Sequence, residues 1–148
     1  MPRCSATVRP ATAGDTTHPM ASIYATAAVR PVLREVGIFN TTALEVAVGL
    51  VRLTTLGTVG AAAVEVNEDD PSHTILATVA GTHTGTAPSF TTDAFIRRAN
   101  LGAAEGSGVI WTFGGNGIII PNTTGDGVGV ICAVGTSQIC DVTLTWDE

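Results

Sequence analysis

Residues 109–121 read VIWTFGGNGIIIP, and this stretch decides the expected fold. Two apolar runs flank the residues GGNG at 114–117, and glycine and asparagine adopt the positive φ that tight hairpin turns need. The segment GSG at 106–108 and Pro121 mark the two ends of the stretch. We therefore predict a central β-hairpin, buried on at least one face, with the rest of the chain packed around it.

Short apolar segments separated by Gly, Pro and Asn recur on both sides of this stretch. The pattern predicts strands at 22–30, 32–39, 43–50, 61–66, 74–80, 128–134 and 139–146. The last of these alternates strictly, with Cys140, Val142, Leu144 and Trp146 on one face. The alanine-rich segment 61–66 and residues 91–101 fit a short helix as well as a strand, and both alternatives stay open.

The predicted elements amount to about eight or more short strands and at most one helix. Short strands of even spacing are typical of a sandwich or barrel, so we predict an all-β, jelly-roll-like β-sandwich over residues 22–148. Residues 1–21 are polar, rich in Pro and Thr and without hydrophobic period, which predicts a flexible or extended N-terminal arm outside the core. The arm is either a disordered leader or a segment that becomes ordered on a neighbouring subunit.

The composition narrows the classes of partner. Hydrophobic residues make up 45% of the 148 residues and charged residues only 14%, with a net charge of −6. All seven basic residues are arginine and form no basic stripe, so we expect no nucleic-acid partner. No apolar run reaches the length of a transmembrane helix, so we expect no membrane partner. A surface so poor in charge favours coverage by copies of the same chain or by another protein.

Two cysteines lie in the last two predicted strands. If Val134 pairs with Gln138, Cys132 lies opposite Cys140, and a cross-strand disulfide is geometrically possible at a pair without ladder hydrogen bonds. The alternative, which we favour, is two reduced cysteines packed in the core as small hydrophobic residues. Cys4 belongs to the predicted arm and has no obvious partner.

The chain carries no recognisable catalytic, metal or cofactor motif. His18, His73 and His83 are scattered, lack metal-ligand spacing and are expected at the surface. No serine occupies a G-x-S-x-G nucleophile elbow. We therefore predict a protein that is not an enzyme and that uses no metal and no cofactor.

Arginines are the candidate contact residues. Arginine forms bidentate pairs with carboxylates and suits subunit interfaces better than lysine does. The candidates are Arg34, Arg52, Arg97 and Arg98 in the sandwich and Arg3 and Arg9 in the arm. The alternative is that these side chains are solvated individually.

Four segments resemble a family of small structural proteins encoded by tailed bacteriophages and prophages of high-GC bacteria. They are PVLREVGIFNTT at 31–42, GVIWTFG at 108–114, QICD at 138–141 and WDE at 146–148. The resemblance runs from about Met20 to the last residue and contains no active-site signature. It implies a component of the virion.

From the resemblance and the composition we expect a capsid decoration or cement protein. It would bind the major capsid protein on the outer shell as a homo-oligomer such as a trimer, in virions assembled in the host bacterial cytoplasm. The alternative is a glycan- or receptor-binding module on the tail or head surface. Glycan stacking uses exposed aromatic side chains, and Trp111 and Trp146 both lie in strands that we expect to be buried.

Overall fold

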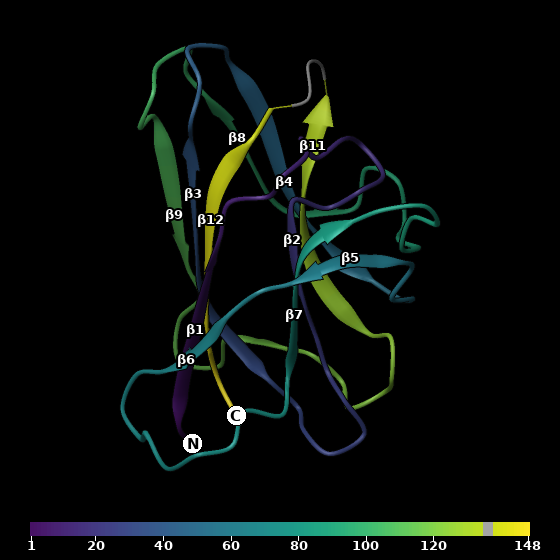
Figure 1. Ribbon diagram of the computed structural model, residues 1–148, viewed down its shortest axis with the longest axis vertical. Coiled ribbons are helices and arrows are strands. Elements are labelled where there is room, and N and C mark those ends of the chain that lie inside the picture. The colour runs from purple at the N-terminus through teal and green to yellow at the C-terminus, as the bar shows by residue number, and fades with distance from the viewer. Residues whose placement is uncertain (135–137) are drawn as a thin grey trace.

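The protein is a sandwich of two antiparallel β-sheets packed face to face (Figure 1). The computed structural model describes residues 1–134 and 138–148, which contain twelve strands and no helix. Sheet A comprises β1 (Arg3–Val8), β3 (Val32–Asn40), β6 (Glu65–Asn67), β9 (Gly108–Thr112), β10 (Ile118–Ile119) and β12 (Cys140–Asp147). Sheet B comprises β2 (Ala21–Tyr24), β4 (Val46–Leu53), β5 (Val59–Ala62), β7 (Thr78–His83), β8 (Phe95–Leu101) and β11 (Gly127–Val134). The predicted all-β sandwich is confirmed.

Strands that are far apart in the sequence pair in a nested order. Sheet A runs β10–β3–β12–β1–β6, with β9 also paired to β3, and sheet B runs β5–β7–β2–β11–β4–β8. Thus β1 pairs with β12, β2 with β11, β3 with β9 and β4 with β8. The two ends of the chain therefore lie at the same end of the sandwich (Figure 1), where Arg3 is the register partner of Asp147.

The alternation predicted for the last strand forms one wall of the core. Cys140, Val142, Leu144 and Trp146 are buried between the sheets, and the residues between them in the sequence are only partly buried. Because side chains point to opposite faces of a strand with period two, apolar alternation in 140–146 is enough to orient β12. Val46, Val48 and Leu50 of β4 face the same core from sheet B.

Sheet B is covered on its second face as well. Tyr24, Val51 and Ile131 belong to a smaller cluster, against which Phe90 and Phe95 pack. This explains why β11 is buried at all positions except its last, Val134. A strand with apolar neighbours on both faces needs no polar alternation.

Residues 3–8 belong to the sandwich, so the prediction of an arm outside the core is wrong for this segment. β1 lies between β12 and β6, and Cys4, Ala6 and Val8 are buried. Met20 is also fully buried, and its N–H donates to the carbonyl of Val130 at 2.8 Å. The small side chains of Cys4 and Ala6 make a weak hydropathy pattern, although their alternation with polar residues is that of a half-buried strand.

Residues 109–121 form an interrupted edge strand, so the predicted central hairpin is wrong. β9 and β10 both pair antiparallel with β3, with Thr112 opposite Glu35 and Ile118 opposite Leu33. The chain leaves the edge in the glycine segment, closes a turn with the N–H of Gly117 on the carbonyl of Gly114 at 2.8 Å, and returns in the same direction. Gly117 has a positive φ of 58° in this local turn, after which the strand continues in the same direction and does not reverse.

Other boundaries differ locally from the predictions. Residues 95–101 form a strand, which resolves the open alternative for 91–101. Segment 61–66 is shared by β5 and β6, which lie in different sheets. The first predicted strand ends at Tyr24, because the bridge between Thr26 and Val29 turns the chain before Pro31.

Candidate interaction surface

Cys132 and Cys140 lie on opposite sheets and are not cross-strand partners, so the less favoured alternative of a cross-strand disulfide does not apply. Cys132 is the register partner of Val48 in sheet B, and Cys140 is that of Asn40 in sheet A. Both thiols are free and fully buried, as in the alternative of two small hydrophobic residues in the core. Burial raises the pKa of Cys140 to about 12, so this thiol stays protonated at neutral pH. Residues 135–137 of the connection that we expected to close the pair lie outside the described part of the chain.

The outer face of sheet A carries exposed apolar side chains. A cross-strand row joins Thr7, Thr143, Gly37 and Ile110, which are register partners and project to the same side. Thr7 and Thr143 share a hydrogen bond between their hydroxyl oxygens at 3.0 Å. The face comprises Ser5, Thr7, Glu35, Gly37, Phe39, Val66, Ile110, Thr112, Asp141, Thr143 and Thr145.

Phe39 and Ile110 supply the apolar part of this face. Ile110 is 55% exposed and Phe39 is 37% exposed. A Cβ atom at Gly108 would lie 2.3 Å from the ring of Phe39, so the glycine is needed where the ring crosses the neighbouring strand. The outer face of sheet A is thus rich in small side chains and open, whereas aromatic side chains pack against the outer face of sheet B.

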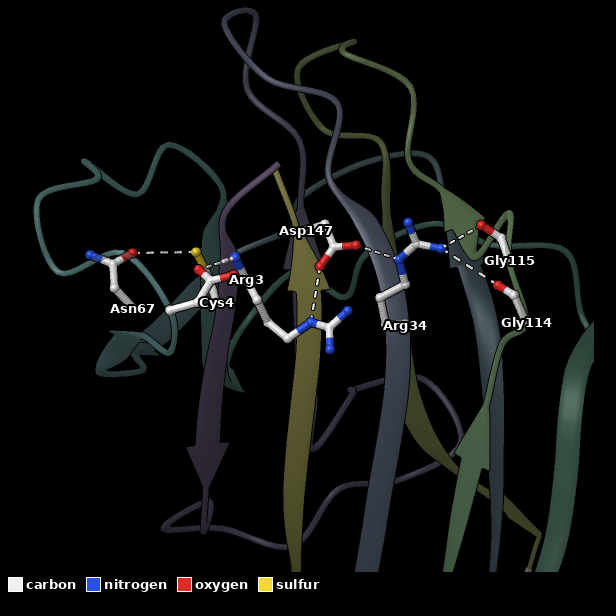
Figure 2. A network of polar contacts seen from close by, with 8 residues as sticks. Arg3, Cys4, Arg34, Asn67, Gly114, Gly115 and Asp147 are labelled. Atoms are coloured by element: carbon white, nitrogen blue, oxygen red, sulfur yellow. Dashed lines mark hydrogen bonds and ion pairs between the residues drawn. The ribbon is translucent and has the colours of Figure 1, made fainter.

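Two of the candidate arginines converge on one carboxylate at the end of this face (Figure 2). Asp147 accepts from the Nε atoms of Arg3 at 3.1 Å and Arg34 at 2.6 Å. Arg34 also donates through Nη1 to the carbonyl of Gly115 at 2.8 Å and so anchors the glycine excursion. Burial opposes ionisation of Asp147, but the hydrogen bonds from both arginines outweigh it, and the pKa of Asp147 lies below its usual value.

Replacement of Asp147 by Asn should destabilise the fold. The amide keeps the shape but removes the charge that both arginines share, and hydrogen bonds to charged groups contribute about 2 kcal/mol each. We expect Asp147→Asn to lower the free energy of unfolding by about 2 kcal/mol, measured by urea denaturation. Asp141→Asn is the matched control, because Asp141 pairs with one exposed arginine, Arg9, and should cost clearly less. Equal losses in the two variants would contradict the role of the shared carboxylate.

The other four candidate arginines lie apart from this network. Arg9 forms a bidentate pair with Asp141, with both N–O distances at 2.6 Å. Arg52 donates to the carbonyl of Ile119 at 2.8 Å and so links the two sheets at one end. Arg97 and Arg98 lie on the edge strand β8, and their guanidinium groups stack 5.7 Å from the ring of Phe113 and 5.4 Å from that of Phe95, respectively. The six arginines do not form one contact surface.

His83 is buried, so the prediction of a surface histidine is wrong at this position. Its Nε2 lies 2.7 Å from Ser22 Oγ, and its Nδ1 is buried without a partner among the described residues. Burial lowers the pKa of His83 to about 4, and the charge of His18 adds to this effect. The strand that we predicted over 74–80 extends further along the chain, and residue 83 is the last residue of β7.

One cluster of potential metal ligands was missed because its members are far apart in the sequence. Cys4, His73 and Glu148 lie together where both ends of the chain meet the 68–77 connection. No local spacing in the sequence signals such a site, since each residue comes from a different segment.

Comparison of the chain with protein-family models, with curated proteins and with solved structures gave no match. Among the described residues there is no helix of the length and hydrophobicity that a membrane crossing requires. The functional argument therefore depends on the surface and on the polar clusters of this chain alone.

Proposed function

We propose that the protein is a structural component of the virion of a tailed bacteriophage. In this proposal it is a decoration or cement protein that binds the major capsid protein on the outer shell as a homo-oligomer such as a trimer. The resemblance of residues 31–42 and 108–114 to phage structural proteins supports this class. Both segments lie in the same part of sheet A, on β3 and on its partner β9.

The open outer face of sheet A is the observation that carries the proposal. Ile110 and Phe39 are exposed beside threonines that bind one another across the strands. A sheet face with small polar and apolar side chains loses little side-chain entropy when a partner covers it. The charged residues near it are largely paired within the chain, so a partner does not have to neutralise them.

The nested pairing of β1 with β12, β2 with β11, β3 with β9 and β4 with β8 supports a jelly roll. Jelly rolls serve both in viral capsid domains and in lectin domains, so the fold is compatible with the proposal and with its alternative. A glycan- or receptor-binding module would require an exposed aromatic platform. Trp146 is fully buried and Trp111 is nearly so, and neither tryptophan can provide that platform.

We also propose that the protein is not an enzyme. Ser22 and His83 are one described pair of hydroxyl and imidazole groups, with 2.7 Å between Oγ and Nε2. Both residues are buried in sheet B, and Ser22 has no exposed surface. A substrate therefore has no access to the hydroxyl group.

A charge on the outer face of sheet A should disrupt assembly without affecting the fold. We expect Ile110→Glu to weaken self-association and attachment to purified phage heads by more than about tenfold, because the carboxylate would be buried without a partner. Leu44→Glu is the matched control, since Leu44 is 57% exposed and Ile110 is 55% exposed. Native mass spectrometry measures the oligomer, and co-sedimentation with heads measures attachment. If both variants assemble like the wild type, sheet A is not the assembly surface.

A further inference from the structure

Three side chains of different chemistry converge at the end of the sandwich that holds both chain ends. The Sγ of Cys4, one ring nitrogen of His73 and one carboxylate oxygen of Glu148 all lie within 4.8 Å of one another. Cys4 comes from β1, His73 from the 68–77 connection, and Glu148 follows β12 directly. Cys4 is fully buried, and the side chain of His73 is 20% exposed.

The carboxylate of Glu148 is held in place by hydrogen-bond donors. The backbone N–H of Leu76 donates to Oε1 at 2.6 Å, and that of Ala77 donates to Oε2 at 3.0 Å. The indole N–H of Trp146 donates to Oε2 at 3.1 Å. These three donors hold the carboxylate in place, and Nε2 of His73 lies 3.0 Å from Oε1, the oxygen that also accepts from Leu76. Outer-shell hydrogen bonds of this kind orient metal ligands.

Asn67 positions the other two members of the cluster. Its Oδ1 accepts from Cys4 Sγ at 3.4 Å (Figure 2), and Cys4 and Asn67 are register partners in sheet A. Its Nδ2 donates to the backbone carbonyl of His73 at 2.7 Å. One amide thus ties the thiol of β1 to the connection that carries the imidazole.

We propose that Cys4, His73 and Glu148 bind a zinc ion with a fourth coordination position left for water. Zn²⁺ accepts sulfur, nitrogen and carboxylate oxygen as ligands in tetrahedral geometry, whereas Mg²⁺ and Ca²⁺ require oxygen ligands. The ion takes the place of the direct contact between His73 and Glu148, and the donors from Leu76, Ala77 and Trp146 remain.

The bound ion would crosslink three segments that are far apart in the sequence. It would connect the first strand, the 68–77 connection and the last residue, in the way a disulfide clamps a small domain. Because the ligands are brought together only in the folded state, the ion stabilises that state by its binding free energy. Cys4 and the side chain of Glu148 are fully buried, and we assign the ion a role in the stability of the fold. The proposal is independent of the virion function.

Metal titration of the reduced, full-length protein tests the proposal. After treatment with a chelator, Zn²⁺ should bind at one ion per chain and raise the melting temperature. Co²⁺ in place of Zn²⁺ should produce the charge-transfer absorption of a cobalt–thiolate bond. The affinity for both ions should fall by more than about tenfold in Cys4→Ser and in His73→Gln. His73→Gln keeps the thiol of Cys4. Because the side chain of His73 is partly exposed, we expect this variant to fold.

Two variants outside the cluster serve as controls. Cys132→Ser tests whether another buried thiol accounts for the absorption, and serine can still donate to the carbonyl of Gly14, as Cys132 does. His18→Gln tests whether another histidine accounts for the binding. Both controls should bind Zn²⁺ like the wild type. Absence of any Zn²⁺-dependent shift in the wild type, or equal affinity in His73→Gln and the wild type, would overturn the proposal.

Discussion

Deletion of residues 1–9 is expected to unfold the protein. β1 pairs with β12 from Arg3 to Val8 and with β6 on its other edge, so its loss exposes the edge of β12 and detaches β6. Each lost ladder hydrogen bond removes about 1 kcal/mol, and burial of a side chain the size of Val8 adds about 2 kcal/mol. The free energy of unfolding of a domain is only about 5–15 kcal/mol, so the loss of an interior strand removes most of it.

Circular dichroism and urea denaturation of the truncated protein measure this effect. Two substitutions at neighbouring positions of β1 test, in the full-length chain, whether the buried face of the strand is needed for folding. Ala6→Asp puts a charge into the core and should unfold the protein, whereas Ser5→Asp lies on the outer face and should leave it folded. A truncated chain that melts like the wild type would show that residues 1–9 are a peripheral arm after all.

Protonation of His83 is expected to cause a large loss of stability in mild acid. In the unfolded chain a histidine takes up its proton near pH 6.5, whereas burial holds the pKa of His83 at about 4 in the folded chain. The unfolded state therefore binds more protons than the folded state between these two values, and the free energy of unfolding falls as the pH falls through that window. The difference of 6.5 − 4 = 2.5 pKa units corresponds to about 3 kcal/mol, fully developed near pH 4.

Urea denaturation at several pH values checks the sign and the size of this effect. His83→Gln keeps a polar group beside Ser22 but does not titrate, so its stability should fall less between pH 6.5 and 4 than that of the wild type. The stability of His18→Gln should fall more than that of the wild type over the same pH range. The hydrogen bonds of His18 to Gly85 and Asp15 raise its pKa, so its protonated form stabilises the fold below pH 6.5, and the variant loses that contribution. Parallel pH profiles for the wild type and His83→Gln would contradict the buried-histidine assignment.

Strong apolar alternation made much of the fold predictable. In β12 the pattern Cys140, Val142, Leu144, Trp146 determined which face is buried, because bulky side chains alternate with polar ones. In β1 the same alternation is carried by Cys4 and Ala6, which are too small to dominate a composition rich in Pro and Thr. β1 is recognised as a strand only in the folded structure, where it pairs with β12 on one side and with β6 on the other.

Glycine-rich segments were ambiguous for a different reason. The residues GGNG at 114–117 permit positive φ, but that property fits a chain reversal and a local excursion equally well. The carbonyl of Gly115 accepts from Arg34, so a long-range contact favours the excursion. Likewise Cys132 and Cys140 are close in sequence, yet they belong to different sheets because their strands pair with β4 and β3.

The candidate sites depend almost entirely on tertiary structure. Of the six arginines proposed from the sequence, Arg3 and Arg34 meet on Asp147, a partner that no local pattern indicates. Cys4, His73 and Glu148 meet only because nested strand pairing brings both chain ends to one end of the sandwich. Chemistry that is distributed in this way along a chain cannot be read from spacing.

The number of copies per particle tests the proposed function most directly. If a tailed phage carries the gene, as we propose, quantitative mass spectrometry of its purified virions, with heads and tails separated, measures this number. The account predicts many copies that co-purify with heads, in a constant ratio to the major capsid protein. A few copies that co-purify with tails would favour a receptor-binding module, and absence of the protein from both fractions would contradict a role in the virion.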